Sequence, residues 1–127
     1  MKITLEILPQ LFSVCQVESI TAEDLRAEYT FFARTDCELS LVCPTAHVPE
    51  KTAAREDGWR GFRIAGVLDF SLIGILAGIS SVLAEAGVGI FAVSTFNTDY
   101  ILVKEENLDK AVSALSDVGY IIAESRY

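Results

Sequence analysis

The sequence predicts an α+β fold in which helices pack against an antiparallel sheet. Two stretches of the second half carry apolar residues at helical spacing, and short β-branched runs lie before, between and after them. Residues 1–58 add further strand-like runs. The chain has 127 residues, of which 51% are hydrophobic and 22% charged, so it can bury a core and has the composition of a globular protein.

The clearest predicted element is a helix that begins at Leu72. Its apolar residues recur at i, i+3, i+4 and i+7, which places them on one face. They are Leu72, Ile75, Leu76, Ile79, Val82, Leu83 and Ala86. Asp69 and Ser71 can each accept a backbone N–H bond at a helix start, and Gly87 suits a left-handed residue at the end. A strand over residues 62–69 leads into this helix.

A hairpin is predicted after the helix. Residues 88–94 form a short apolar run, residues 95–99 (TFNTD) have the composition of a turn, and residues 100–104 form the return strand. A second helix is expected to begin at its cap, Asn107, and to end at Gly119, and a closing strand follows. The order β-α-β-β-α-β is the split βαβ, or ferredoxin-like, arrangement with both helices on one face of the sheet.

The first half, residues 1–58, is predicted to be a shorter, strand-rich domain before a domain over residues 59–127. Its predicted strands are residues 2–8, 11–17, 29–34 and 38–43. Pro9 and Gln10 are expected to break the first two strands, so that the second folds back. Thr21-Ala-Glu-Asp24 resembles a capping box that opens a short helix. Residues 44–58, with two prolines and then a charged run, are expected to be a loop or one exposed helical turn.

The two halves share a faint similarity. Thr35-Asp36 precedes the apolar strand Leu39–Val42, and Thr98-Asp99 precedes the apolar strand Ile101–Val103. One such match also arises by chance, so two interpretations stay open: an internal repeat, or two unrelated hairpins.

The net charge, the lengths of the uncharged runs and the cysteine spacing disfavour several classes of partner and location. A net charge of −8 and a pI near 4.5 disfavour nucleic acid and anionic membrane surfaces, which need a basic face. Glu6 interrupts the first apolar stretch, so no export signal is expected, and no uncharged run reaches the length of a membrane span. The three cysteines follow no C-x-x-C spacing, which fits the cytoplasm better than a disulfide framework.

Residues 62–124 resemble an ACT domain, the small regulatory module that binds amino acids in aspartate kinases. The stretch GVLDFSLIGILAGISSVLAEAGVGIFAVSTFNTDYILV is more closely similar to the ACT units of the CASTOR arginine sensors and their bacterial relatives. The ELSLVC strand of the first half is similar to the first ACT-like unit of those proteins. The resemblance implies a non-catalytic regulatory protein that binds a small molecule of the amino acid class, without a cofactor or metal.

The resemblance also implies a ligand site between ACT units, either in one chain or across a dimer. It is made by the first strand-helix loop and by the second strand with its following turn. The implied residues are Asp69, Phe70, Ser71, Leu72, Ile73 and Gly74 in the loop, and Val93, Ser94, Thr95, Phe96 and Asn97 facing it. Arginine specificity does not carry over, because this chain is far shorter than the eukaryotic sensors.

The chemistry of an amino acid fits these residue types. N–H groups in the first turn of the helix would receive the ligand carboxylate, and Asp69 would receive its ammonium group. Gly74 has no Cβ, which lets a ligand approach the first turn closely. The simpler interpretation is that Asp69 or Ser71 only caps the helix and that Gly74 permits packing of the helix on the sheet.

Other functions find weaker support. Cys37, Cys43 and His47, with Cys15, could be written as a zinc site, but structural zinc sites have closer cysteine pairs. An acylphosphatase would need a basic anion cradle where this chain has Asp69, and an RNA-binding domain would need basic and aromatic residues on its central strands. The alternative that stays open is a ligand-free protein interaction module. A homodimer is expected, because the predicted strand 88–94 has no charge to discourage edge pairing. A monomer becomes possible if the first half supplies the second ACT unit within the chain.

Overall fold

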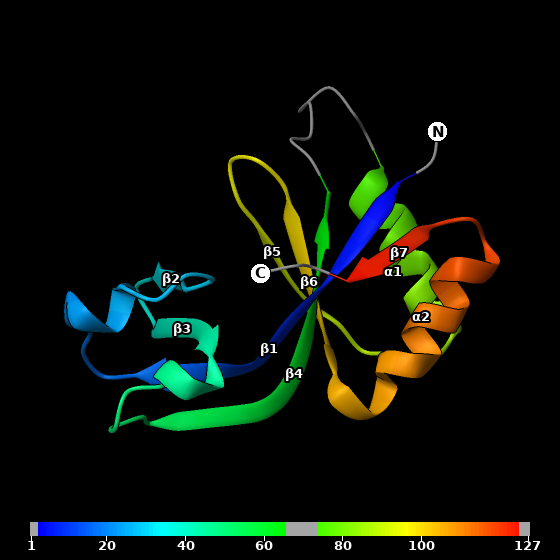
Figure 1. Ribbon diagram of the computed structural model, residues 1–127. Helices are drawn as coiled ribbons and strands as arrows, with labels where there is room; N and C mark the ends of the chain where they lie inside the picture. Colours follow the sequence, from blue (N-terminus) through cyan, green and yellow to red (C-terminus); the bar gives the residue numbers. More distant parts are fainter. Residues whose placement is uncertain (1–2, 66–73, 125–127) are drawn as a thin grey trace. The chain divides into compact units, whose positions relative to one another are not determined.

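The computed structural model describes residues 3–65 and 74–124 (Figure 1). In chain order its strands and helices are β1 (Thr4–Val17), β2 (Phe31–Arg34), β3 (Leu39–Pro44), β4 (Ala54–Ile64), α1 (Ile75–Glu85), β5 (Phe91–Ser94), β6 (Asp99–Lys104), α2 (Leu108–Asp117) and β7 (Ile121–Glu124). Three short 3₁₀ turns lie between them: η1 (Glu23–Leu25), η2 (Thr45–His47) and η3 (Glu105–Asn107). The predicted order β-α-β-β-α-β is therefore confirmed from β4 to β7.

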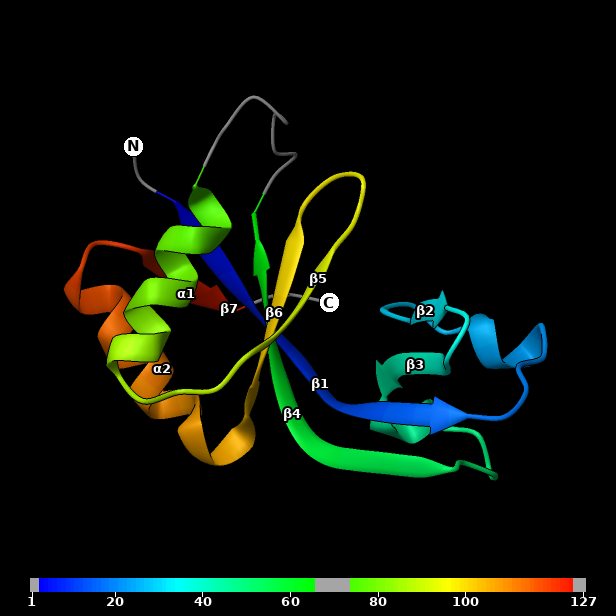
Figure 2. The same cartoon turned by 180° about the vertical axis from the view of Figure 1, so that it is seen from behind.

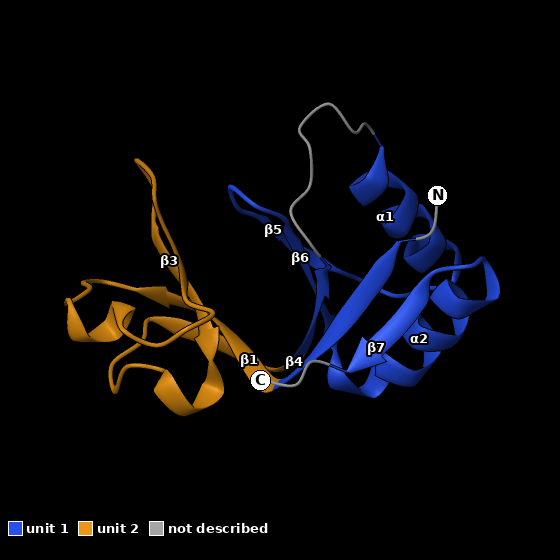
Figure 3. Cartoon of the chain, turned by 45° about the horizontal axis from the view of Figure 1, so that its top comes forward, with its two compact units in different colours: residues 1–9, 60–127 blue, residues 10–59 orange. Residues whose placement is uncertain are grey.

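The chain divides into two compact units (Figure 3). Unit 1 comprises Met1–Pro9 and Arg60–Tyr127, and unit 2 comprises Gln10–Trp59. The strands β1 and β4 each contribute residues to both units. The first residues of the chain therefore belong to the same unit as its second half.

Unit 1 holds both helices on one face of its strands (Figures 1 and 2). Its strand order is β5-β6-β4-β1-β7. β7 pairs with β1 in parallel, with Thr4 opposite Ile121, so the predicted sheet of antiparallel strands is wrong at this edge. The helices contribute Ile79, Leu83, Ala111 and Leu115 to a core that they share with β1, β4 and β6. Unit 1 therefore has the predicted ferredoxin-like arrangement, with one extra strand, β1, inserted between β4 and β7.

Both helices of unit 1 end at the predicted glycines, Gly87 and Gly119. Gly87 has φ +76°, and Val88 N–H donates to the Leu83 carbonyl at 2.9 Å. Gly119 has φ +103°, and Tyr120 N–H donates to the Leu115 carbonyl at 3.1 Å. This pairing is the Schellman motif, which needs a left-handed residue where glycine costs least.

The start of α2 was predicted correctly, with Asn107 as its N-cap, whereas the start of α1 was not. Asn107 makes no side-chain cap bond, because it is the last residue of η3 and its φ of −100° and ψ of 0° do not hold its side chain over the first turn of α2. α1 begins at Ile75, three positions after the predicted Leu72, and its N-cap is Gly74. The strand predicted over residues 62–69 is observed as far as Ile64, and residues 66–73 lie outside the described residues.

Unit 2 has the strand order β2-β3-β1-β4, with 3₁₀ turns where unit 1 has helices. Its small core contains Cys15, Val17, Leu41 and Cys43. The predicted capping box forms at η1: Thr21 N–H donates to Asp24 Oδ2 at 2.9 Å, and Asp24 N–H donates to Thr21 Oγ1 at 3.3 Å. Only a three-residue turn follows it, so the expected short helix is a 3₁₀ turn.

Two strand boundaries in the first half were predicted wrongly. β1 runs from Thr4 to Val17 without the break expected at Pro9 and Gln10. It pairs with β7 up to Ile7 and with β3 from Phe12 onward, so the missing N–H of Pro9 removes a bond from neither of these ladders.

The second wrong boundary is at β4, which begins at Ala54 within the segment predicted to be a loop. Its charged residues are compatible with a strand because they have partners. Arg55 pairs with Asp57, with Nη2 to Oδ1 at 2.9 Å, and Asp57 also accepts the hydroxyl of Ser13 from β1 at 2.6 Å. The bond between Asp57 and the distant Ser13 therefore favours a strand where the local composition predicted a loop.

The hairpins of the two units share one register. In β2–β3 the pairing runs from Phe31↔Val42 to Arg34↔Leu39, and in β5–β6 from Phe91↔Leu102 to Ser94↔Asp99, so every number rises by 60. The turn bonds also match, since Thr35 N–H donates to the Glu38 carbonyl and Thr95 N–H to the Thr98 carbonyl, both at 2.9 Å. The two hairpins are thus similar, but the alignment predicted from the sequence is wrong, because Thr35 corresponds to Thr95 and not to Thr98.

Candidate functional site

The predicted ligand site falls partly within the described residues, all of them in unit 1. Asp69, Phe70, Ser71, Leu72 and Ile73 lie outside the described residues. Val93 and Ser94 end β5, whereas Thr95, Phe96 and Asn97 form the turn into β6. Gly74 precedes α1. The end of β4, the start of α1 and the tip of the β5–β6 hairpin lie at the same end of unit 1 (Figures 1 and 2).

The tip of the β5–β6 hairpin is a hydrogen-bonded turn with exposed side chains. The Thr98 carbonyl accepts two bonds from Thr95, from N–H and from Oγ1, each at 2.9 Å. Thr95 and Asn97 are exposed, and Phe96 is 81% exposed. The turn therefore presents a hydroxyl, an amide and an aromatic ring on a fixed backbone.

Thr98 is the residue of this turn that points inward. It is 7% exposed, and its Oγ1 donates to the carbonyl of Ile64, the last residue of β4, at 2.7 Å. No role was predicted for Thr98, because the bond joins positions 34 residues apart. The bond fixes the hairpin tip to the end of β4, and it is buried.

Gly74 has a conformational role that the sequence did not reveal. Its φ of +85° and ψ of 3° are left-handed, and its carbonyl accepts the Gly78 N–H at 2.8 Å to open α1. A Cβ built at Gly74 would meet none of the described residues within 4 Å, so those residues do not need a glycine there for packing of the helix on the sheet. At Gly78, by contrast, a Cβ would lie 3.1 Å from Tyr120 Oη.

The start of α1 offers backbone donors. Among the residues that the structure describes, no side chain caps the helix, and the first amides of an α-helix have no intrahelical acceptor. Together with the helix dipole, such amides favour an anionic group placed before the first turn. α1 is an 11-residue helix, long enough for this effect.

A polar cluster in unit 2 was not predicted. Ser13 is fully buried, and its hydroxyl lies 2.8 Å from Thr45 Oγ1 and donates to Asp57 Oδ1 at 2.6 Å. Arg55 donates to the same carboxylate oxygen through Nε and Nη2, at 3.0 and 2.9 Å. These residues are distant in sequence, and no motif links them. Their bonds hold β1, η2 and β4 of unit 2 together.

The cysteines do not form a metal site. Burial raises the pKa of the Cys15 thiol, and it raises the pKa of Cys43 to about 11, so both stay protonated at neutral pH. Cys37 is exposed at the tip of the β2–β3 hairpin. Within residues 3–65 and 74–124, no three His, Cys, Asp or Glu side chains gather as metal ligands would.

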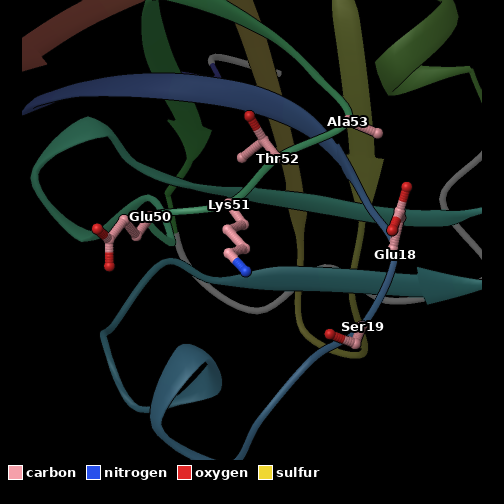
Figure 4. Close-up of a pocket in the computed structure, with 6 residues that line it drawn as sticks. All are labelled: Glu18, Ser19, Glu50, Lys51, Thr52 and Ala53. Atoms are coloured by element: carbon pink, nitrogen blue, oxygen red, sulfur yellow. The ribbon is translucent and has the colours of Figure 1, made fainter.

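Two of the surface hollows formed by described residues lie away from the predicted site. One, of about 480 Å³ in unit 2, is lined by Glu18, Ser19, Glu50, Lys51, Thr52 and Ala53, and its charged groups point in different directions (Figure 4). The other, of about 400 Å³ in unit 1, lies beside Gly78, Val82 and Tyr120. Neither hollow includes a predicted site residue. In the described part of the chain, no helix is long and apolar enough to cross a membrane.

Comparison with known proteins relates the chain to regulatory modules. The family model of the ACT domain matches residues 54–117. The human cytosolic arginine sensor for mTORC1 subunit 1 is 37% identical over 65 residues, which are 50% of this chain and 20% of the sensor. The chain thus spans about a fifth of the length of the curated relatives it matches.

Solved structures agree along the whole chain. A crystal structure of an Agrobacterium tumefaciens protein superposes with a TM-score of 0.89 at 31% identity and covers 100% of this chain and 96% of that one. The ligand-free regulatory subunit of aspartate kinase from Thermus thermophilus gives a TM-score of 0.61 at 10% identity, covering 89% of this chain and 95% of that one, which shows a shared fold. The predicted resemblance is confirmed, and the chain belongs to the ACT domain family.

Proposed function

We propose that this protein is a non-catalytic regulatory module of the cytoplasm that binds a small amino acid. The ligand is held at the loop between β4 and α1 and at the β5–β6 turn. The family and the 37% identity to a human protein named as an arginine sensor support a regulatory binding role. The site is expected to involve Asp69–Gly74 on one side and Val93–Asn97 on the other.

The observation that carries this proposal is the position of three chain segments in unit 1. The end of β4, the start of α1 and the β5–β6 tip lie at one end of the unit (Figures 1 and 2). There the first amides of α1 provide donors for a carboxylate. Thr95 and Asn97 add an exposed hydroxyl and an exposed amide, which complement the polar groups of an amino acid.

The site is proposed to be completed by a second ACT unit, from a second copy of the chain. β5 is the last strand of its sheet and has no charged residue, so its outer edge is available for pairing. The shared register of the two hairpins also supports the proposal that unit 2 is a shortened ACT-like unit. Sedimentation of the full chain tests the homodimer, and a monomer at high concentration contradicts it.

A ligand-free interaction module is the second candidate. It is favoured by large apolar side chains at the surface of unit 1: Phe96 is 81% exposed, Val118 61% and Ile121 44%. Exposed apolar side chains become buried when a partner protein covers them, and a protein interface needs them to form one contiguous patch. The two candidates differ in whether any small molecule stabilises the protein.

A thermal-melt screen against the twenty amino acids distinguishes these candidates. A ligand at about a hundred times its dissociation constant adds about 2.7 kcal/mol to stability, which raises the melting temperature by several degrees in a chain of this size. A selective shift supports binding, whereas no shift from any compound contradicts the amino acid proposal and favours the interaction module.

The site is tested by Asn97→Ala, with Cys37→Ala as its matched control. Asn97 is exposed in the β5–β6 turn, and Cys37 is exposed at the corresponding position, 60 residues earlier, in the β2–β3 turn. Asn97→Ala is expected to reduce the ligand shift, and Cys37→Ala to leave it unchanged. Gly74→Val is a poorer test, because its left-handed φ of +85° strains any β-branched residue. Equal responses of both alanine variants would remove the β5–β6 turn from the site.

A further inference from the structure

We propose that Thr98 is a positioning residue for the ligand site, because its buried hydroxyl fixes the tip of the β5–β6 hairpin to the end of β4 before a ligand binds. This inference rests on the proposed function. It adds a residue that lies outside the predicted site and that acts through Thr95 and Asn97.

The geometry is that of a residue bonded in two directions. Thr98 Oγ1 donates to the Ile64 carbonyl at 2.7 Å, and Thr98 and Ile64 are only 7% and 1% exposed. On its other side the Thr98 carbonyl receives Thr95 N–H and Oγ1 at 2.9 Å. One side chain therefore bonds the turn to the end of β4, in addition to the pairing of β6 with β4 in the sheet.

The matching turn of unit 2 lacks this bond. Glu38 occupies the place of Thr98, and its backbone makes the same turn contact with Thr35 at 2.9 Å. The Glu38 side chain is exposed and makes no hydrogen bond with any described residue. The two turns therefore share their internal bonds, and only the turn of unit 1 is anchored to a neighbouring strand by a buried side chain.

An anchored turn lowers the cost of binding. A loop that is already ordered loses less conformational freedom when a ligand contacts it, which increases affinity. Removing the Thr98 hydroxyl leaves the Ile64 carbonyl buried without that donor, so the turn is expected to move away from β4 to hydrate it. Thr95 and Asn97 move with the turn, since they belong to the same bonded unit.

Three variants of the full chain test the inference. Thr98→Val keeps the shape of the side chain and removes the donor, whereas Thr98→Ser keeps the donor. Val112→Ala serves as a stability control, because Val112 packs partly buried on α2, outside the hairpin. Hydrogen exchange of the turn amides is measured without ligand, and calorimetric titration is carried out with each of the twenty amino acids as probe.

Thr98→Val is expected to speed exchange of the amides in residues 94–99 by about tenfold, with residues 34–39 unchanged. It is also expected to weaken binding of the compound that wild type binds by about tenfold, whereas Thr98→Ser and Val112→Ala stay close to wild type. A merely structural role predicts that Thr98→Val and Val112→Ala weaken binding equally.

Two results would overturn the inference. Unchanged exchange in residues 94–99 of Thr98→Val shows that the hydroxyl does not fix the turn, and this result needs no ligand. Faster exchange with an unchanged dissociation constant shows an anchor without a positioning role. If wild type binds none of the probes, the proposed function fails and the positioning role fails with it, while the exchange data still report whether the anchor exists.

Discussion

The two hairpins of this chain have the same register and different surroundings. β2–β3 and β5–β6 align with a constant offset, and a 3₁₀ turn follows each one, η2 at Thr45–His47 and η3 at Glu105–Asn107. In unit 1 the strands are covered by α1 and α2, and in unit 2 only η1 and η2 take their place. A shared strand pattern therefore does not require a shared core.

The two units are stabilised by different kinds of contact. In unit 1, large apolar side chains such as Leu83 and Leu115 pack between helices and sheet and are fully buried. In unit 2, the core combines Cys15 and Cys43 with larger side chains such as Leu41, and the buried polar cluster around Ser13 adds bonds between its elements. Unit 1 is held together by apolar packing between helices and sheet, whereas unit 2 adds buried polar bonds to a smaller apolar core.

The largest expected effect follows from the two cores. Leu83→Ala removes a fully buried side chain from α1, where helix and sheet limit collapse, and is expected to lower the free energy of unfolding by about 3 kcal/mol. Leu41→Ala, fully buried in unit 2 beneath short turns that can close over the cavity, is expected to cost about 2 kcal/mol.

Urea unfolding followed by circular dichroism measures both changes. Leu25→Ala is the control, because Leu25 is 43% exposed in unit 2 and its loss is expected to cost less than about 0.5 kcal/mol. A larger cost for Leu41→Ala than for Leu83→Ala would show that unit 2 is packed as rigidly as unit 1.

The next effect concerns alkaline pH. Burial raises the pKa of Cys43 from 9.0 to about 11, so the folded state holds its thiol proton more tightly than the unfolded state. This contribution to stability is complete below pH 9 and is lost as the pH rises to 11, by about 2 kcal/mol at most. Urea midpoints from pH 8 to 11 are expected to fall more steeply in wild type than in Cys43→Ala, and parallel curves would contradict the assignment.

Much of unit 1 could be predicted because its signals are local. Gly87 and Gly119 end the helices in Schellman motifs that need only neighbouring residues, and the turn at residues 95–98 is specified by its own side chains. The path of β1 through Pro9 and the start of β4 at Ala54 depend instead on strands that are distant in sequence, so local composition predicted breaks there.

In the candidate site, too, the local features were predicted and the long-range contacts were not. The sequence placed Val93 to Asn97 at the end of a strand and in a turn, as observed. It did not identify Thr98, because a threonine in a turn has no local feature that reveals a bond to Ile64. It also assigned Gly74 a packing role as one interpretation, whereas the need for glycine there comes from φ +85°, which depends on where α1 begins.

The smallest expected effect compares the two turns directly. Thr95→Val removes the 2.9 Å bond from Oγ1 to the Thr98 carbonyl and the 3.4 Å bond from Thr98 N–H to Oγ1. Thr35→Val removes a longer 3.5 Å bond to the Glu38 carbonyl and two 3.1 Å bonds from the amides of Cys37 and Glu38. We expect losses of about 1 kcal/mol for Thr95→Val and about 0.5 kcal/mol for Thr35→Val. The difference arises because the turn of Thr95 is bonded to β4 through Thr98 and is partly buried. The groups that lose a partner in Thr95→Val therefore cannot move freely to bond with water.

Urea unfolding of both valine variants, with Thr95→Ser and Thr35→Ser as hydroxyl-retaining controls, measures this difference. Adding Thr98→Val to each variant tests which residues act together. Losses in the free energy of unfolding are non-additive for residues in one bonded network and additive for separate sites. Thr98→Val is expected to be non-additive with Thr95→Val and additive with Thr35→Val. Additivity in both pairs would mean that the anchor and the turn of unit 1 are energetically independent, and the two hairpins would then differ in their surroundings alone.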